Sequence, residues 1–386
     1  MRVLIIHNKY GKYSGEEAVI DSQIELLRKR GVTVESYFRS SEEIPRMKYG
    51  QFRAFLTGFY NPKSIKEVSD ILLEFKPDIV HIHNLYPLIS PAILKKIKAM
   101  DIPIAMTVHN YRLCCPNGLY FSKNEICERC NGGKEWNCII RNCESDYMKS
   151  IGYSLRNFFA RIKKYYLNNV DRYLCLTEFQ KGKMIENGYC ENRIVIIPNM
   201  YKEVSHQIYN GEKEYFAVVG RISPEKGVEK LISVAHKLKH IEFKLAGQKR
   251  DGYLEDIKLP DNLEFVGSLN RNQLCDFYAK STALIHTSRV YEGFPMVFPE
   301  AMSFRLPIIA PRMAGYPEII EDGINGLLYD TDDINDLTSK IVSLWESPSD
   351  RDKFGESGFI KMKSMYSEMV YGDKLLNEYE NILKNE

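Results

Sequence analysis

The chain has 386 residues, of which 44% are hydrophobic and 27% are charged, so it is not a disordered or low-complexity polymer. No stretch reaches the roughly 18 apolar residues that a membrane-spanning helix needs. The apolar opening at residues 1–6 is too short for a secretory signal, and we therefore expect a cytoplasmic protein. The length predicts two large domains.

The net charge of +2 hides a difference between the two halves of the chain. Residues 1–210 contain 31 Lys and Arg against 22 Asp and Glu, whereas the remainder contains 22 against 29. A basic half indicates an anionic partner such as a membrane surface, a phosphorylated lipid or a nucleic acid. Uneven scatter of surface charge explains the numbers equally well, and both interpretations stay open.

The first half of the chain predicts a β-α-β opening, with a strand at 2–7, a helix at 16–30 and a strand at 33–38. Further continuous apolar runs are typical of strands that a parallel sheet buries on both faces. These runs lie at 78–83, 103–109, 172–176 and 194–197. We therefore expect a doubly wound α/β domain.

A second β-α series follows residue 211. Its expected strands are 215–219, 242–246, 263–266, 283–286 and 307–310. We place an N-terminal domain at residues 1–205 and a C-terminal domain at 206–365, with a closing amphipathic helix at about 366–386 that packs back on the first domain. Open α/β sheets bind ligands beyond the carboxyl ends of their strands, so we expect the site in a cleft between the domains.

Two motifs in the second half indicate a phosphate-binding site. Glu292 and Glu300 follow the strand at 283–286, and a helix that begins near Pro295 would offer free N–H groups to a phosphate. A carboxylate such as Glu300 suits paired ribose hydroxyls. Arg221 and Lys226 follow the strand at 215–219, where two cations can hold a diphosphate leaving group. Taken alone, these cations are better explained as exposed loop residues.

Together the motifs resemble the retaining glycosyltransferases of family 4, which have the GT-B fold with two Rossmann-like domains. The resemblance also runs through segments 14–17, 78–84, 107–112, 197–199 and 323–327. It implies that Arg221, Lys226, Glu292 and His109 are catalytic. The donor-binding residues it implies are Gly15, Arg221, Lys226, Glu292, Gly293, Phe294, Pro295, Met296, Val297 and Glu300. The acceptor residues it implies are Glu16, His83, Asn84, Tyr111 and Arg112.

The sequence departs from the family at Ser14 and at Arg305, where the family usually has glycine, so close backbone approach near the donor is left to Gly15. The resemblance implies attack on the face from which the diphosphate departs, with the leaving phosphate oxygen taking the acceptor proton. His109 would then face the transferred sugar, and a role as general base is the second choice.

We expect catalysis without a metal or other cofactor. The acidic triplet at 330–332 looks like a metal-binding sequence, but it directly precedes a helix expected at 334–345 and is explained as capping. Six of the nine cysteines lie between residues 114 and 143. A similar cysteine-bearing insertion occurs in a family 4 branch that acts in polysaccharide assembly, and Cys115, Cys127, Cys130 and Cys143 match it best. A structural zinc and free thiols both stay open.

Two basic and aromatic segments are candidates for contact with the inner membrane surface. Residues 148–169 predict a basic amphipathic helix, and residues 46–66 are a second candidate surface, for the acceptor or for the membrane. A packed helix with one solvated face explains the first segment slightly better.

The leading hypothesis is a metal-independent, hexosyltransferase-type enzyme that moves a sugar from a UDP- or GDP-sugar to a glycan or lipid-linked acceptor in the synthesis of capsule, O-antigen or exopolysaccharide. The alternatives are a GT-B-fold sugar-nucleotide epimerase and a non-catalytic nucleotide- or nucleic-acid-binding module. We expect no nucleic-acid partner, because the aromatic residues form no single-strand-binding motif. A nicotinamide dehydrogenase is disfavoured, because no Gly-x-Gly-x-x-Gly follows the first strand.

Overall fold

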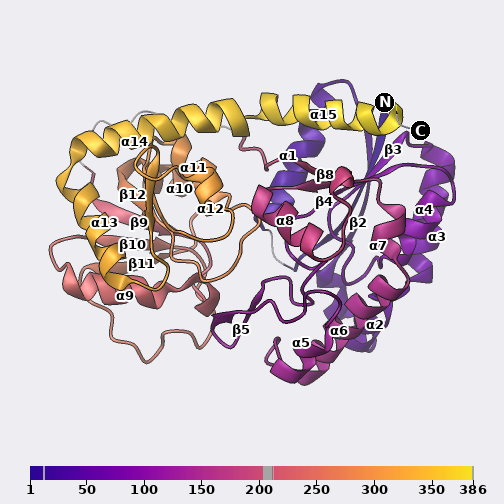
Figure 1. The fold of residues 1–386 in the computed structure, drawn as a ribbon, viewed down its shortest axis with the longest axis horizontal. Coiled ribbons are helices and arrows are strands. Elements are labelled where there is room, and N and C mark those ends of the chain that lie inside the picture. The colour runs from indigo at the N-terminus through magenta and orange to yellow at the C-terminus, as the bar shows by residue number, and fades with distance from the viewer. Residues whose placement is uncertain (12–13, 203–210, 212, 385–386) are drawn as a thin grey trace. The chain divides into compact units, whose positions relative to one another are not determined.

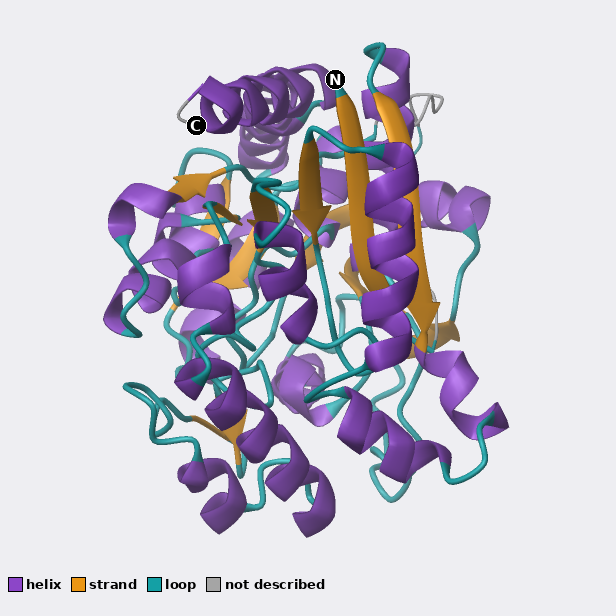
Figure 2. Cartoon of the chain, turned by 90° about the vertical axis from the view of Figure 1, so that its right-hand side faces the viewer, coloured by secondary structure: helices purple, strands orange, loops and turns teal. Residues whose placement is uncertain are grey.

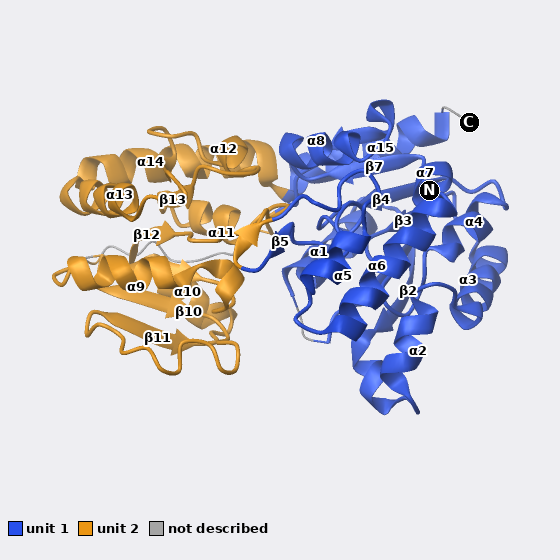
Figure 3. Ribbon diagram, turned by 60° about the horizontal axis from the view of Figure 1, so that its bottom comes forward, with its two compact units in different colours: residues 1–123, 127–200, 368–386 blue, residues 124–126, 201–367 orange. Residues whose placement is uncertain are grey.

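The computed structural model describes residues 1–11, 14–202, 211 and 213–384. These residues form two compact units (Figure 3). Unit 1 comprises residues 1–123, 127–200 and 368–386, and unit 2 comprises residues 124–126 and 201–367. The predicted boundary between residues 205 and 206 lies outside the described residues.

Unit 1 is built on a six-stranded parallel sheet with the strand order β2-β1-β3-β4-β7-β8. Its strands are β1 (Arg2–Lys9), β2 (Thr33–Ser40), β3 (Ile79–Ile82), β4 (Ile104–Thr107), β7 (Arg172–Cys175) and β8 (Ile194–Ile196). β3 and β4 are buried along their whole length, as their continuous apolar sequences predict. The strand order reverses between β1 and β3, which makes the carboxyl ends of these strands the expected place for a ligand.

Unit 1 has nine α-helices among its described residues. They are α1 (Gly15–Lys29), α2 (Gly50–Thr57), α3 (Pro62–Phe75), α4 (Ala92–Lys98), α5 (Trp136–Arg141), α6 (Tyr147–Ile162), α7 (Tyr165–Asn169), α8 (Glu178–Glu186) and α15 (Glu368–Lys384). α1, α4 and α8 contact strands of the sheet, whereas α2, α5 and α6 lie beyond its edge (Figures 1 and 2). α15 closes the core of unit 1, since Tyr371, Leu375 and Tyr379 are buried with side chains of β1 and α1. The single helix expected at 148–169 is wrong, because Lys164 takes a left-handed conformation (φ 50°) that separates α6 from α7.

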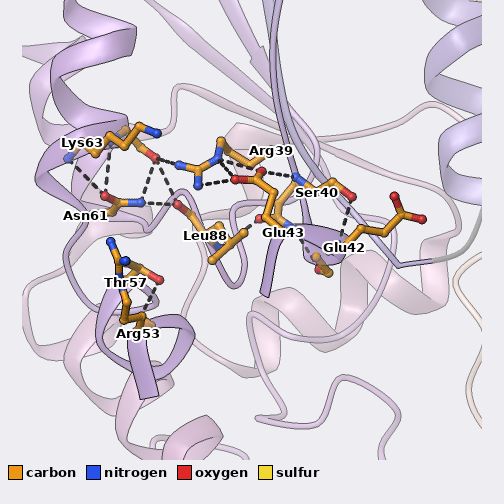
Figure 4. Close-up of polar contacts among 12 residues, drawn as sticks. Arg39, Ser40, Glu42, Glu43, Arg53, Thr57, Asn61, Lys63 and Leu88 are labelled. Atoms are coloured by element: carbon orange, nitrogen blue, oxygen red, sulfur yellow. Dashed lines mark hydrogen bonds and ion pairs between the residues drawn. The ribbon is translucent and has the colours of Figure 1, made fainter. Parts of the chain in front are cut away.

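A polar network fixes the chain between β2 and α3 (Figure 4). The buried Arg39 guanidinium donates to both carboxylate oxygens of Glu43, with Nε–Oε1 at 2.9 Å and Nη2–Oε2 at 2.6 Å, and also to Ser64 Oγ at 3.2 Å. Ser64 Oγ and the Asn61 amide both donate to the carbonyl of Leu88. The short helix η1 (Ser41–Arg46), α3 and the loop after β3 are thereby joined.

Unit 2 has a second six-stranded parallel sheet, in the order β11-β10-β9-β12-β13-β14. Its strands are β9 (Tyr215–Val219), β10 (Phe243–Ala246), β11 (Leu263–Gly267), β12 (Ser281–Ile285), β13 (Ile308–Pro311) and β14 (Gly326–Tyr329). This is the strand order of dinucleotide-binding folds, and it reverses between β9 and β12. Sequence analysis missed β14, which at four residues is among the shortest strands of the sheet.

The helices of unit 2 are α9 (Val228–Lys237), α10 (Arg271–Lys280), α11 (Val297–Ser303), α12 (Tyr316–Ile319), α13 (Ile334–Glu346) and α14 (Pro348–Lys361). α9 and α13 bury Leu231, Leu337 and Ile341 in one core with Phe216 and Phe243 of the sheet. In the part of the chain that the structure describes, no helix has the length and apolar character needed to span a bilayer.

Candidate functional site

The carboxyl ends of β9 and β12 bring charged side chains together in unit 2. Lys226 closes the short helix η3 (Pro224–Lys226) after β9, and its Nζ donates to Glu292 Oε1 at 2.8 Å. The same carboxylate oxygen lies 3.0 Å from His286 Nε2 and 3.4 Å from the Tyr316 hydroxyl. Glu292 is therefore held by three side chains beside the reversal of strand order.

The two predicted carboxylates have opposite electrostatic settings. Burial alone would raise the pKa of Glu292, but the charge on Lys226 and the hydrogen bond with His286 hold it well below the usual range. Burial raises the pKa of Glu300 to about 7, although the Tyr278 hydroxyl donates to its Oε2 at 2.9 Å. Glu292 is thus a fixed anion, whereas Glu300 can take a proton near neutral pH.

Hydrogen bonds to backbone carbonyls join the loops after β9 and β12. Thr287 Oγ1 donates to the Lys226 carbonyl at 2.7 Å, and the Arg289 amide donates to the Glu225 carbonyl at 2.9 Å. Gly227 is left-handed (φ 64°), and a Cβ there would lie 2.4 Å from the Thr287 carbonyl oxygen. Glycine at this position therefore lets the two loops approach.

The remaining predicted donor residues of unit 2 fall into two groups. Arg221 is 70% exposed and contacts Glu225 at 3.5 Å, so it does not join the Lys226–Glu292 cluster. Gly293, Phe294 and Pro295 are buried, and Met296 and Val297 are half-buried at the start of α11. α11 begins at Val297, two residues after the expected start, and carries Glu300 in its first turn.

Unit 1 presents histidines at the carboxyl ends of β1, β3 and β4. His83 Nδ1 lies 2.8 Å from His109 Nε2, so the two rings meet edge to edge, with their centres 5.1 Å apart. His81 stacks on His83 with the ring centres 4.5 Å apart, and the centre of the nearly perpendicular His7 ring lies 6.2 Å away. Burial lowers the pKa of His7, His81 and His109 to about 3 and that of His83 well below its usual range. These four rings are therefore neutral at physiological pH.

A carboxylate lies beside the histidines. Burial raises the pKa of Glu16 to about 7, although the charge on Arg112 acts in the opposite direction. The Tyr10 hydroxyl donates to Glu16 Oε2 at 3.0 Å, and Glu16 Oε1 lies 3.6 Å from His7 Nδ1. Arg112 is half-buried over the Tyr10 ring at 5.6 Å, and Gly15 is the first residue of α1.

The structure gives three predicted acceptor residues a setting that differs from our expectation. His83 is buried against His109, and the Asn84 amide donates to the carbonyls of Asn8 and Tyr86. Tyr111 is buried against Tyr120 and Phe179. These side chains build the loops at the strand ends, whereas Glu16 and Arg112 keep some exposure.

Sequence reasoning missed His7, Tyr10 and His286. His7 and His286 were assigned only to strands, yet each directly follows an apolar run of its strand, Val3–Ile6 and Ala283–Ile285. A polar residue in that position of a parallel sheet is the signal that could have identified them.

The cysteine-rich segment does not form a ready metal site. Cys138 and Cys143 share a hydrogen bond between their thiols, and Cys115 Sγ lies 3.0 Å from Asn117 Oδ1. Across the described residues, no group of three or more His, Cys, Asp or Glu side chains has an arrangement that could hold a metal ion. α13 is capped by Asp333 rather than by the triplet at 330–332. The zinc prediction at Cys115, Cys127, Cys130 and Cys143 stays a prediction.

Comparisons with known proteins agree with this architecture. Residues 202–360 match the family model of glycosyl transferases group 1, and residues 13–202 match that of glycosyltransferase family 4. An uncharacterized glycosyltransferase of Methanocaldococcus jannaschii is 35% identical over 201 residues, covering 50% of this chain and 55% of the relative. The chain thus spans about half the length of that relative. An uncharacterized 42.6 kDa protein in the cps region of Klebsiella pneumoniae is 27% identical over 288 residues, covering 74% and 70%.

Among solved structures, Anabaena HepE in complex with UDP and glucose has a TM-score of 0.67 and 15% identity, with 99% of this chain and 100% of that chain covered. At this identity the likeness concerns the fold, which confirms the predicted GT-B architecture of two parallel-sheet α/β domains. The two family models together cover residues 13–360. The chain belongs to the group 1 glycosyltransferases with the GT-B fold.

Proposed function

We propose that this protein is a retaining glycosyltransferase that moves a hexosyl group from a nucleotide diphosphate sugar to a glycan or lipid-linked acceptor in surface polysaccharide assembly. The observation that carries the proposal is the Lys226–Glu292–His286 cluster at the reversal of strand order in unit 2. HepE, with the same fold, binds UDP and glucose, and the Klebsiella relative is encoded in a cps region. Both facts favour this donor and this pathway.

Each group of the donor would meet a chemically matched residue. Lys226 and the exposed Arg221 would neutralise the charge that grows on the departing diphosphate. Glu300, with its pKa raised to about 7, can donate to one ribose hydroxyl and accept from the other. The ionised Glu292 holds the Lys226 ammonium in place, so that this cation is positioned before the donor arrives.

Retention of configuration follows if the acceptor hydroxyl attacks on the face from which the diphosphate departs. The leaving phosphate oxygen takes the acceptor proton, so no side-chain base is required. His109, which is neutral at physiological pH, would contact the transferred sugar as a hydrogen-bonding group. The reaction would need no metal ion, since Lys226 and Arg221 supply the positive charge.

A thermal-shift screen against UDP, GDP, ADP, dTDP and NAD, with and without EDTA, tests the donor site. We expect one diphosphate to stabilise the protein and EDTA to leave that effect unchanged. NMR of the product formed with the matching sugar nucleotide then reports its anomeric configuration. A response to NAD alone, or turnover of the sugar nucleotide without an acceptor to an epimerised product, would contradict the proposal.

An exposed apolar surface on unit 1 favours a lipid-linked acceptor and peripheral contact with the inner membrane face. The turn after α2 packs on α6 through the edge-to-face contact of Phe59 with Phe159, at 5.3 Å, and α5 also packs on α6 (Figure 1). Phe52, Ile140 and Met148 of these helices are 64 to 73% exposed. Together with the basic residues beside them in the sequence, these exposed side chains define a surface that suits the acyl boundary of a bilayer.

Cosedimentation with phosphatidylglycerol vesicles and with phosphatidylcholine vesicles tests this surface. Wild-type protein should bind the anionic vesicles more strongly, because basic residues such as Arg53 and Lys149 flank the apolar side chains. The double variant Phe52→Asp, Ile140→Asp should lose most of this binding. Leu73→Asp is the matched control, since Leu73 is 64% exposed on α3. Equal binding by all three proteins would contradict the membrane contact.

A further inference from the structure

The ring of His83 is enclosed by three other histidines in the core of unit 1. It stacks on His81 with an interplanar angle of 12°, meets His109 at its edge with an angle of 24°, and lies nearly perpendicular to His7, at 89°. Its Nδ1 makes one hydrogen bond, to His109 Nε2 at 2.8 Å. Its Nε2 is buried without a hydrogen-bond partner among the described residues. His83 therefore has a single polar contact, which is directed at His109.

Hydrogen bonds fix the orientation of His81, the ring on which His83 stacks. Tyr371 donates to Gln23 Oε1 at 2.8 Å, which leaves the Gln23 amide nitrogen as the donor to His81 Nδ1 at 3.0 Å. The Tyr379 hydroxyl also contacts His81 Nδ1. With Nδ1 accepting, the proton of His81 is on Nε2 and is donated to Thr107 Oγ1 at 2.8 Å. The ring beneath His83 therefore has no freedom to rotate.

Because both rings are neutral, the proton in the hydrogen bond between them can belong either to His83 Nδ1 or to His109 Nε2. If His109 Nε2 carried the proton, the proton of His83 would be on Nε2, where it would be a buried N–H without an acceptor. Buried N–H groups without a partner are rarer than incompletely satisfied acceptors. With the proton on His83 Nδ1, only a lone pair is left unpartnered. The second arrangement is therefore favoured.

We propose that His83 is a positioning residue that donates from Nδ1 to His109 Nε2 and thereby holds His109 as the Nδ1–H tautomer. His109 then presents an N–H donor, because its only free ring nitrogen carries the proton. The structure gives His109 Nδ1 no hydrogen-bond partner within the described residues, and the His109 side chain is half-buried rather than enclosed. This inference rests on the proposed function for its consequence, which is that His109 binds an oxygen of the transferred sugar and does not act as a base.

The tautomer can be measured directly on the full-length wild-type protein. Long-range proton–nitrogen correlation spectra of protein labelled with ¹⁵N in its histidine rings distinguish protonated from bare nitrogens, and the signals of His109 are assigned by their loss in His109→Gln. We expect a protonated Nδ1 and a bare Nε2 in His109 at pH 7.5. A proton on Nε2 of His109 would overturn the inference, whatever the enzyme activity.

Two variants separate positioning from simple packing. His83→Asn keeps an amide donor near the position of Nδ1, whereas His83→Leu keeps similar bulk without a donor. We expect kcat to fall about 10- to 100-fold in His83→Leu, to recover to within about threefold of wild type in His83→Asn, and the thermal shift with UDP to be unchanged in both, since UDP lacks the sugar. In His83→Leu the spectra of His109 should show a mixture of tautomers.

The outcomes also separate this inference from the proposed function. Absence of sugar transfer by the wild-type protein would count against the proposed function and leave the tautomer measurement to decide the role of His83. Equal activity of His83→Leu and wild type would overturn the positioning role even if transfer occurs. If His83→Leu does not fold, the wild-type spectrum and the activity of His83→Asn still decide.

Discussion

The two units end their parallel sheets in different chemistry. In unit 2, the strand ends carry an ion pair, Lys226 with Glu292, and the anion is stabilised in spite of its burial. In unit 1, the strand ends carry histidines that burial keeps neutral, beside a carboxyl group, Glu16, whose pKa is raised to about 7. Similar folds therefore provide a charged edge suited to a diphosphate and a weakly charged edge suited to hydroxyl groups.

The largest effect should come from removing the charges of unit 2. Lys226→Ala and Glu292→Gln should each lower sugar transfer about 10²- to 10³-fold, because a preorganised charge at the leaving group is lost. Steady-state kinetics with the donor found by thermal shift checks this, with circular dichroism to confirm folding.

Lys244→Ala is the matched control for this prediction. Lys244 also pairs with a glutamate of unit 2, Glu264, at 3.4 Å, but Glu264 is 61% exposed. Its removal should change transfer less than threefold, as expected for a surface pair. Comparable losses in Lys244→Ala and Lys226→Ala would mean that the charged edge has no special role.

Acid should weaken unit 1 before unit 2. The four neutral histidines bind fewer protons folded than unfolded, so each lowers the free energy of unfolding by up to about 1.4 kcal/mol per pH unit as the pH falls from about 6.5. Glu16 binds more protons folded than unfolded between pH 7 and 4.5, so it opposes this change but is one group against four. In unit 2, Glu300 likewise raises the free energy of unfolding as the pH falls over this range. Glu292 begins to lower the free energy of unfolding only as the pH falls below about 4.5.

Hydrogen exchange at pH 7.5 and 5.0, corrected for the intrinsic pH dependence of exchange, measures this difference. Peptides from β1, β3 and β4 should lose protection at pH 5.0, whereas peptides from β9 and β12 should keep it. Equal losses in the two sheets would show that the histidines do not set the acid stability of unit 1.

Sequence patterns predicted this comparison in part. The bounds of β9, the presence of the closing helix α15, the doubly wound sheets and the positions of Lys226 and Glu292 after their strands all follow from local apolar runs and loop chemistry. The burial of His83 and its contact with His109 do not, because they depend on pairing between strands that are 26 residues apart in sequence. The break at Lys164 was missed for a related reason, since helical spacing of apolar residues continues across it.

A moderate effect is expected in the cysteine segment of unit 1, on the rates at which its thiols are alkylated. A hydrogen bond from the Cys138 thiol lowers the pKa of Cys143, whereas burial raises the pKa of Cys115 and Cys130. Iodoacetamide at pH 7 should therefore modify Cys143 faster than those two thiols, and several-fold more slowly in Cys138→Ala. Peptide mass spectrometry measures the rates.

The same experiment tests the predicted zinc ion. Joint protection of Cys115, Cys127, Cys130 and Cys143 that a chelator removes would support a metal site, and elemental analysis would then show about one zinc per chain. Rapid modification of Cys143 without a chelator, together with no zinc, would support free thiols.

The smallest effect is expected at Arg305 in unit 2, where the family usually has glycine. Arg305 is left-handed (φ 53°), which explains the glycine preference and costs about 1–2 kcal/mol. Its guanidinium pairs with Glu356 at 2.6 Å and lies 4.1 Å from the centre of the Phe359 ring, contacts that at exposed sites stabilise by about 1 kcal/mol each or less.

The cost of the left-handed backbone and the stabilisation by the two contacts nearly cancel, so Arg305→Gly should shift the melting temperature by no more than about 4 °C. Arg305→Ala loses the contacts and keeps the strained backbone, and it should melt below both wild type and Arg305→Gly. Because neither variant touches the Lys226–Glu292 cluster, transfer should stay within about twofold in both. If the alanine variant proved as stable as the glycine variant, backbone strain could not be the reason for the glycine preference. The contribution of Arg305 to the stability of unit 2 would then come from its contacts with Glu356 and Phe359.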